Sequence, residues 1–434
     1  MILGTAQIDI TPPLGGELSG FAARQQPSTG LLDPLFAKVL YLATAEARLL
    51  WIHCDLIGFD HQIVADFRQW ARTHLGLLAE QVILSATHTH AGPATIHLRE
   101  AGEYDAAYVA LLHHRLRQGA RIALQHSEPV GLTIVEGHCD LAVERRQTVT
   151  PHTDPRVAAL GFRRSNGDFA AVLVNYAMHP VALGAGNRWI SADIFGAAAV
   201  ELAQTLPGSP VVLLTNGACG NLNPPAENVS FEQVKLWGRQ LAAAVAPQLK
   251  AATCDPQPRL NLARRLVRLP LDTLDADGIN QFARQARQNL VPLNQWGDKY
   301  LRVVEHWRNA RLQGQLSGSP PFHAAELFAV GFNDVLLLGA NAEVFSEFTD
   351  WLRRERSAPT YLVGYANGDL GYLPTRAAYA EGGYEVDVAH LFYGVFRPRA
   401  GGLELLAAAS AELIRELPVQ APSARGFTPA WVRH

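Results

Sequence analysis

Residues 82–93 of the chain, VILSATHTHAGP, join a short apolar run to two closely spaced histidines. The run at 82–85 predicts a buried strand, and Gly92-Pro93 is expected to end the extended segment. Because side chains at i and i+2 of a strand point to the same side, His88 and His90 are expected to face one cavity at the strand end. Such a pair can supply nitrogen ligands to a metal ion, although an isolated His-x-His is more often satisfied by backbone groups and water.

Strand-like and helix-like segments alternate on both sides of this histidine segment. Predicted strands, short and rich in Val and Leu, lie at 39–42, 49–57, 82–85, 169–177, 211–215 and 327–338. Predicted amphipathic helices lie at 62–78, 193–206, 230–249 and 403–417. This alternation predicts an α/β or mixed α+β fold, with sheets flanked by helices and the functional site at strand ends. No internal repeat is evident in the sequence.

Residues 251–325 differ in composition from the rest of the chain. They are rich in Arg, Gln and Leu, and helices are predicted around 277–290 and 294–315. The neighbouring arginines Arg264 and Arg265 are interpreted as part of a solvated helix face. We therefore expect a single domain over residues 1–434, in which 251–325 is a helical insertion that covers part of the site.

Composition limits the classes of function. Hydrophobic residues make up 48% of the chain and charged residues 18%, so a large buried core is expected. The formal net charge of −3 argues against a nucleic-acid binder. No apolar run approaches the ~18–20 residues of a membrane span, and no export signal is recognisable at the N-terminus. With four cysteines that lack CxxC spacing, the sequence predicts a cytoplasmic protein with reduced thiols.

Three further segments place reactive groups directly after apolar strands. His179 follows the predicted strand 169–177, and Pro180 ends the ladder there. Residues 217–224, GACGNLNP, follow another strand, and their glycines would let backbone N–H groups approach a ligand. Glu343 lies between a strand and an amphipathic run and could bind a metal ion or stabilise a helix N-terminus. Each of these features, taken singly, is also typical of a purely structural residue.

Taken in this order, the segments resemble the catalytic domain of the neutral ceramidase family, in particular its short bacterial members. The matching segments are Gly4 with Ile8-Asp9-Ile10-Thr11-Pro12, residues 85–93, His179-Pro180, Ile190-Ser191-Ala192-Asp193, residues 217–224, Glu343, and Gly371-Tyr372-Leu373-Pro374-Thr375 with Tyr384. The SATHTHAGP block and the spacing between Tyr372 and Tyr384 are the most specific parts. The resemblance extends from about residue 3 to residue 415.

The resemblance implies one zinc ion per chain and hydrolysis of an amide (N-acyl) bond. The implied zinc ligands are His88, His179, Glu343 and Tyr372. His90 falls where the family has a histidine that contacts substrate and moves a proton. Arg145 and Tyr384 fall on positions that would hydrogen-bond the carbonyl oxygen or the oxyanion. Asp193 and Asp55 are expected to orient the ligands from behind.

Two departures from the family pattern shape the expected mechanism. The chain has Asn223 where well-studied ceramidases have a serine, so attack by zinc-bound water remains, with Asn223 as a hydrogen-bond donor. The sequence also ends before a C-terminal immunoglobulin-like domain could fit, and it lacks the family's export signal. We therefore expect a small or lipid-like N-acyl substrate. Ceramide itself is a less favoured candidate.

Two alternatives remain beside an amide hydrolase. The same metal site could cleave an ester, a lactone or a sugar-linked acetamide. The chain could instead be a non-catalytic binding protein that retains the fold, a possibility that Asn223 invites. Zinc content and chelator-sensitive turnover of N-acyl and O-acyl compounds distinguish these three functions.

Overall fold

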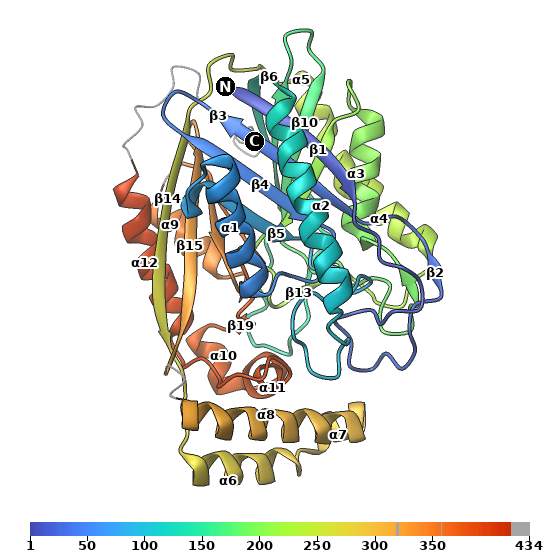
Figure 1. The fold of residues 1–434 in the computed structure, drawn as a ribbon, viewed down its shortest axis with the longest axis vertical. Coiled ribbons are helices and arrows are strands. Elements are labelled where there is room, and N and C mark those ends of the chain that lie inside the picture. Colours follow the sequence, from blue (N-terminus) through green and yellow to red (C-terminus); the bar gives the residue numbers. More distant parts are fainter. Residues whose placement is uncertain (318–320, 357, 418–434) are drawn as a thin grey trace.

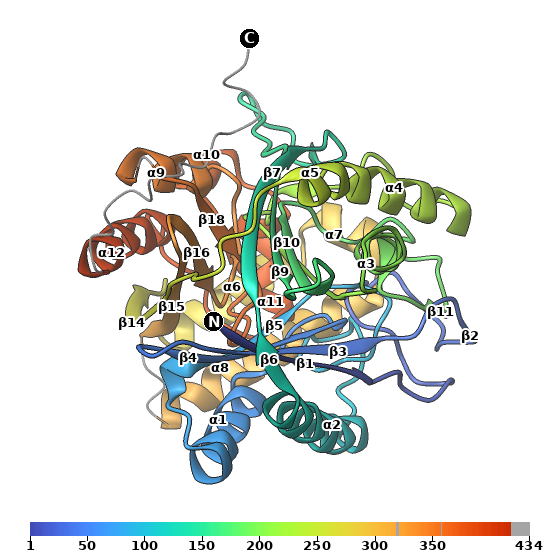
Figure 2. The same cartoon turned by 90° about the horizontal axis from the view of Figure 1, so that it is seen from above.

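Three sheets with the same strand order form the centre of the protein (Figures 1 and 2). The computed structural model describes residues 1–317, 321–356 and 358–417. In each sheet three strands pair antiparallel in succession, and a helix then leads to a fourth strand that pairs parallel with the third. The sheet regions therefore repeat one β-β-β-α-β unit three times, although the sequence shows no repeat.

The three units share this order of elements. The first consists of β1 (Ile2–Asp9), β3 (Phe36–Ala43), β4 (Arg48–Cys54), α1 (His61–Leu75) and β5 (Val82–Ala86), with β6 (Ser127–Pro129) added beside β1. The second consists of β7 (Gly131–His138), β9 (Arg156–Arg163), β10 (Phe169–Tyr176), α3 (Asp193–Thr205) and β12 (Val211–Asn216). The third consists of β14 (Leu260–Pro270), β15 (Phe322–Phe332), β16 (Val335–Ala340), α9 (Phe348–Glu355) and β18 (Thr360–Val363).

The inner faces of the three sheets share one apolar core. Its members come from all three units and include Leu40, Trp51, Phe162, Leu213, Phe328 and Tyr361. Trp51 meets Phe328 edge-on with 6.1 Å between ring centroids, and Phe162 meets Phe332 at 6.0 Å. The helices cover the outer faces, so the central strands are buried on both sides and their sequences are almost continuously apolar (Figure 2).

Each outer face has its own helical layer. The first sheet is covered by α1 and α2 (Ala106–Gln125), the second by α3, α4 (Phe231–Ala243) and α5 (Ala246–Ala251), and the third by α9 and α12 (Gly402–Glu416). The predicted mixed α/β fold with flanking helices is confirmed. None of the sheets in the described part of the chain forms a separate immunoglobulin-like domain.

Helix α2 packs so closely on β1 that only glycine fits at one contact. A Cβ atom at Gly4 would lie 1.7 Å from the carbonyl oxygen of Ala123. We expect Gly4→Ala to lower the free energy of unfolding by about 1–3 kcal/mol, because the helix must move away from the sheet. Gly16→Ala, where no atom lies within 4 Å of the added Cβ, is the matched control. Equal urea midpoints for the two variants would contradict this account of the contact.

The third unit contains a helical excursion between its first two strands. Helices α6 (Ala276–Ala286), α7 (Leu290–Trp296) and α8 (Asp298–Ser317) form a separate layer beyond the strand ends (Figure 1). The expectation that 251–325 is helical is wrong for Leu260–Pro270, which pairs along its whole length with β15. Residues 318–320 of that segment lie outside the described residues. We propose a single domain in which the insertion is confined to the connection between β14 and β15.

The contacts of the two arginines of β14 contradict the prediction of a solvated helix face. Arg264 binds Glu326 of β15 at 2.7 Å, whereas Arg265 binds Glu412 and Glu416 of α12. Their side chains therefore leave the strand on opposite sides, as successive residues of a strand do. Neither arginine belongs to a solvated helix face. This segment is a strand because it pairs with the distant β15, and its local composition does not reveal that pairing.

Short elements order the loops beyond the strand ends. The two-stranded pairs are β2 (Gly30–Leu31) with β11 (Trp189–Ile190), β8 (Val143–Glu144) with β13 (Leu222–Asn223), and β17 (Glu343–Val344) with β19 (Tyr372–Leu373). The short helices are η1 (Ala79–Gln81), α10 (Arg376–Glu381), the π-helical turn η2 (Tyr384–Val388) and α11 (Ala389–Phe392).

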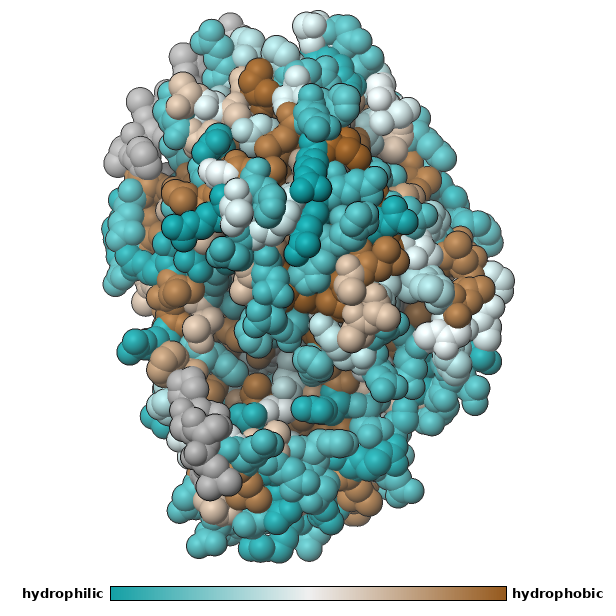
Figure 3. Space-filling model, viewed as in Figure 1, coloured by the Kyte–Doolittle hydropathy of each residue, from teal (hydrophilic) through white to brown (hydrophobic). Residues whose placement is uncertain are grey.

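Hydrophilic residues dominate the face seen in Figure 3, and apolar residues occur there in small groups. No helix in the described part of the chain combines the length and the apolar character needed to cross a bilayer.

Candidate metal centre and its pocket

Each of the three sheets contributes one buried ligand-type side chain to a single cluster. His88 follows β5, His179 follows β10 and Glu343 follows β16. Their candidate ligand atoms all lie within 4.8 Å of one another. The ends of three equivalent sheets converge here, and the structure therefore brings together three residues that are far apart in the sequence.

Backbone carbonyl groups orient both histidines toward Glu343. The Nδ1 atom of His88 lies 2.6 Å from the carbonyl oxygen of Ile57, and that of His179 lies 3.1 Å from the carbonyl oxygen of Leu222. A carbonyl oxygen can only accept, so each Nδ1 carries the proton. The Nε2 atoms then face Glu343 Oε2, at 3.1 Å from His179 and 3.6 Å from His88. A cation at this point would take the place of the proton that His179 shares with Glu343, and carbonyl-oriented imidazoles are the usual ligand form.

The electrostatics of the cluster favour a positive charge between these atoms. Burial lowers the pKa of His88 to about 3, so this imidazole is neutral at pH 7, as a metal ligand must be. Burial opposes protonation of His179, but Cys219 and Glu343 raise its pKa to about 9. Burial likewise opposes ionisation of Glu343, but the hydrogen bond with His179 and the neighbouring imidazoles lower its pKa. The carboxylate is therefore ionised.

Two tyrosines that sequence reasoning missed complete the cluster. The Tyr393 hydroxyl donates to Glu343 Oε1 at 2.5 Å and contacts Asp369 Oδ2 at 3.2 Å. The Tyr365 hydroxyl lies 3.1 Å from His179 Nε2 and 3.3 Å from Glu343 Oε2. A signal for Tyr365 was available, since it follows the apolar strand β18 as His88 follows β5. Nothing local in the sequence marks Tyr393.

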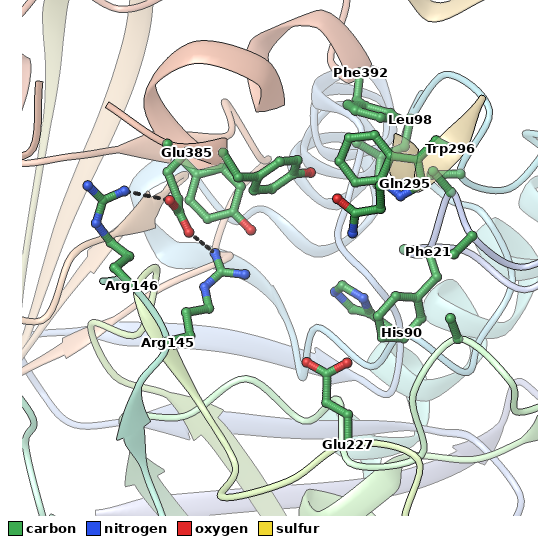
Figure 4. A pocket seen from close by; sticks show the side chains of 18 of the residues that line it. Phe21, His90, Leu98, Arg145, Arg146, Glu227, Gln295, Trp296, Glu385 and Phe392 are labelled. Carbon is green, nitrogen blue, oxygen red and sulfur yellow. Dashed lines mark hydrogen bonds and ion pairs between the residues drawn. The ribbon is translucent and has the colours of Figure 1, made fainter. Parts of the chain in front are cut away.

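A pocket of about 640 Å³ opens beside the cluster (Figure 4). Its walls come from the connections between the first two strands of all three units, through Phe21, Arg145 and Trp296 respectively. Phe21 and Trp296 lie on an apolar side with Leu98 and Phe392, whereas the opposite side is polar (Figure 4). The helical insertion thus contributes directly to the pocket, through Trp296 at the end of α7.

His90 lies between the metal-type cluster and the pocket. Its ring centroid is 4.9 Å from that of His88 and 4.8 Å from that of Phe21. Among the described residues, neither ring nitrogen of His90 has a hydrogen-bond partner. Burial lowers its pKa well below the usual value, and His88 adds to this effect. A neutral imidazole with two free nitrogens can exchange a proton with a bound molecule.

Arg145, Tyr372 and Tyr384 form one wall of the pocket. The Arg145 guanidinium donates to the carbonyl oxygen of Gly220 at 2.7 Å and lies 5.3 Å from the centre of the Tyr372 ring. The rings of Tyr372 and Tyr384 are 5.8 Å apart, edge to face. Tyr384 begins the π-helical turn η2, a rare element that is frequent at functional sites.

No protein-family model matches the chain. The solved structures that share its architecture include two ceramidases. The neutral ceramidase from Pseudomonas aeruginosa matches with a TM-score of 0.70 and 18% identity over 98% of this chain and 76% of that one. A ceramidase complexed with C2 matches with a TM-score of 0.72 and 18% identity over 98% and 77% of the two chains. The chain has the neutral ceramidase fold. The resemblance found in the sequence motifs is therefore confirmed for the three-dimensional structure.

Within this ceramidase fold, the three remaining predicted site residues lie farther from the cluster. Asn223 donates from Nδ2 to Glu227 at 2.8 Å, and Glu227 lines the pocket. Asp193 accepts from the backbone N–H groups of Ala182, Leu183 and Ile194, and so it fixes the loop that follows His179.

Asp55 does not occupy the expected place behind a ligand. Its carboxylate accepts from the Phe36 N–H at 3.0 Å and from Lys38 Nζ at 3.2 Å, and so it ties β3 to β4. The group that orients His88 is instead the carbonyl oxygen of Ile57, two residues farther along the chain. The expected carboxylate partner is replaced by a backbone acceptor because the chain beyond β4 turns past the histidine.

Glu385 holds the arginine wall of this ceramidase fold in place. It is 5% exposed and binds Arg145 at 2.8 Å and Arg146 at 2.6 Å (Figure 4). We expect Glu385→Gln to lower the rate of hydrolysis about 10-fold with the content of bound metal unchanged, because a neutral amide holds the guanidinium less firmly. Glu381→Gln is the matched control, since Glu381 contacts Arg146 and Thr148 instead of Arg145. A loss of bound metal in Glu385→Gln would show a structural role only.

Proposed function

We propose that the protein is a zinc-dependent hydrolase that cleaves an amide (N-acyl) bond. The observation that supports it most is the convergence of His88, His179 and Glu343 beside a pocket. That pocket is also lined by an arginine held by Glu385 and by a histidine that has no hydrogen-bond partner among the described residues. The two structural neighbours described above are ceramidases, which supports the same reaction class. One ion per chain is expected.

The donor set fits zinc in particular. Two imidazoles and one carboxylate are a common ligand set of hydrolytic zinc enzymes, whereas calcium and magnesium prefer oxygen donors only. When bound, a zinc ion would supply Lewis acidity and lower the pKa of a coordinated water to about 7. The burial of both histidines and their orientation by backbone carbonyl groups support this assignment.

The remaining side chains have distinct roles in the proposed reaction. Arg145 and Tyr384 lie on one wall, where an N–H and an O–H would donate to the carbonyl oxygen as negative charge develops on it. His90 would accept a proton from the attacking water and pass it to the departing amine, since neither of its nitrogens has a hydrogen-bond partner among the described residues. Asn223 cannot attack an acyl carbon, and its hydrogen bond to Glu227 instead holds that carboxylate at the pocket wall. Tyr372, next to Glu343 in the β17–β19 pair, is the fourth ligand that the family pattern implies.

The pocket supports an amphiphilic substrate. The apolar side formed by Phe21, Leu98, Trp296 and Phe392 suits an acyl group. The polar side includes Arg146 and Glu227 and suits hydroxyl or amine groups on the other half of the molecule. A small or lipid-like N-acyl compound has both halves.

Zinc analysis combined with a matched substrate screen tests the proposal. We expect one zinc per chain after dialysis against metal-free buffer, and faster turnover of N-acyl compounds than of O-acyl compounds with the same acyl group. A chelator should stop turnover, and added zinc should restore it. Zinc-dependent turnover of esters or lactones alone would replace the amide with a different bond. Protein without zinc and without turnover would favour a binding protein.

A further inference from the structure

Glu227 is a carboxylate of the pocket wall that no cation of the described chain neutralises. The charged side chains that line the pocket are Arg145, Arg146, Glu227, Glu381 and Glu385. Glu385 binds both arginines and Glu381 binds the second of them, so these four charges balance one another. Glu227 has no ion-pair partner among the described residues, and its hydrogen bond comes from the neutral amide of Asn223.

Asn223 fixes the orientation of the Glu227 side chain. Its Nδ2 atom donates to Glu227 Oε1 at 2.8 Å. The amide oxygen of Asn223 is buried and has no hydrogen-bond partner among the described residues. Because a carboxylate and an amide oxygen can only accept, this corner of the pocket contains acceptors without a donor. Figure 4 shows the Glu227 carboxylate directed into the pocket.

The place of Glu227 in the pocket corresponds to the amine half of a substrate. In Figure 4 it lies below His90 and at the other end of the pocket from Phe392, which belongs to the apolar side. The apolar side suits the acyl group, and Arg145 would hold the carbonyl oxygen. The part of the substrate that leaves with the nitrogen therefore lies toward Glu227.

An unneutralised carboxylate favours one kind of group in a ligand. Partial burial raises the pKa of Glu227, which is the reverse of what a bound cation does. An ammonium group supplies the missing charge and the missing donor together, and charge-assisted hydrogen bonds are roughly twice as strong as neutral ones. A hydroxyl group supplies a donor only, and an anionic group is repelled.

We propose that Glu227 selects N-acyl compounds whose amine half carries a second, positively charged amino group. This inference rests on the proposed function and narrows its substrate class. The acyl chain lies along the apolar side, and the free ammonium group binds Glu227. Monoacylated diamines have this form. Water adds across their C–N amide bond, which yields the carboxylic acid and the free diamine.

Two substrates that differ in one group test this selectivity. N-hexanoyl-1,3-diaminopropane carries the ammonium group, and N-hexanoyl-3-aminopropanol carries a hydroxyl group in its place. We expect kcat/KM of the wild type to be about 10-fold higher for the diamine compound, a moderate ratio because Glu227 is in contact with solvent. Glu227→Gln keeps the shape of the side chain but removes its charge, so the ratio should fall to about 1. Glu232→Gln, in an exposed ion pair with Lys235, is the matched control and should keep the wild-type ratio.

An unreactive pair of ligands measures the same selectivity without turnover. In 3-(hexylthio)propylamine and 3-(hexylthio)propan-1-ol a thioether replaces the amide, and their binding is followed by titration calorimetry. The wild type should bind the amine about 10-fold more tightly than the alcohol. Glu227→Gln should bind the two equally, with its content of bound metal unchanged.

The outcomes separate this inference from the proposed function. A wild type that hydrolyses both amides but prefers the alcohol, or prefers neither, overturns the role of Glu227, while the proposed reaction stands. A preference for the amine that survives in Glu227→Gln also overturns that role. A wild type that hydrolyses no amide but binds the thioether amine through Glu227 supports the selectivity and contradicts the proposed reaction.

Discussion

Replacement of Glu343 by glutamine is expected to remove zinc from the protein and to lower hydrolysis by on the order of 10³-fold, equivalent to about 4 kcal/mol. Glu343 is the anionic member of the proposed ligand set and is 1% exposed. A neutral amide cannot balance the charge of the ion, and its NH₂ group would compete for the lone pairs of His179. Metal content and kcat should therefore fall together.

Glu355→Gln is the control for this variant. Glu355 is an exposed residue at the end of α9, and its contact with Arg415 is a surface ion pair 3.5 Å long. That substitution should leave zinc content and turnover unchanged, because surface pairs contribute little. Full activity in Glu343→Gln would exclude the proposed metal centre. Loss of activity with zinc retained would keep the centre and give Glu343 another role.

Replacement of Arg145 by alanine should lower kcat by about 10²–10³-fold while zinc content stays at one per chain. The guanidinium is held by Glu385 and by the Gly220 carbonyl oxygen, so it can donate to an oxyanion without first being ordered. It is not part of the ligand set. The expected loss is therefore one of transition-state stabilisation, with a smaller change in KM.

Arg239→Ala, at an exposed position of α4, is the control for Arg145→Ala. A double variant of Arg145 and Glu385 adds a second test. If Glu385 acts only through Arg145, Arg145→Ala combined with Glu385→Gln should be no slower than Arg145→Ala alone. A further slowing would mean that Glu385 acts on turnover in a second way, for instance through Arg146, which it also binds.

The ligand-type residues were predictable because each follows a strand whose apolar run is visible in the sequence. His88, His179 and Glu343 were placed at strand ends, and the structure brings them within reach of one ion. Whether each binds zinc stays a prediction. The residues around them were harder to predict from the sequence. Tyr393 reaches Glu343 from across the fold, and Asp55 turned out to bind Lys38, since spatial neighbours do not follow sequence spacing.

Fold prediction succeeded for locally periodic elements and failed where pairing is remote. The strand β10 and the helix α4 were expected from their patterns, because an apolar run or an apolar stripe is a local signal. We expected β14 to lie in a helical segment. It is a strand instead, because eleven of its residues pair with β15 across the insertion. The local composition does not indicate that pairing partner.

The sequence by itself determined the mixed α/β class, the strand-end positions of the reactive groups and the likeness to ceramidases. Only the tertiary structure revealed that three sheets repeat one unit and that each provides one ligand-type residue. The physical reason is that backbone hydrogen bonding and apolar burial can build the same unit from unrelated side chains. The repetition therefore exists in the arrangement of strands in space, where sequence comparison along one chain does not detect it.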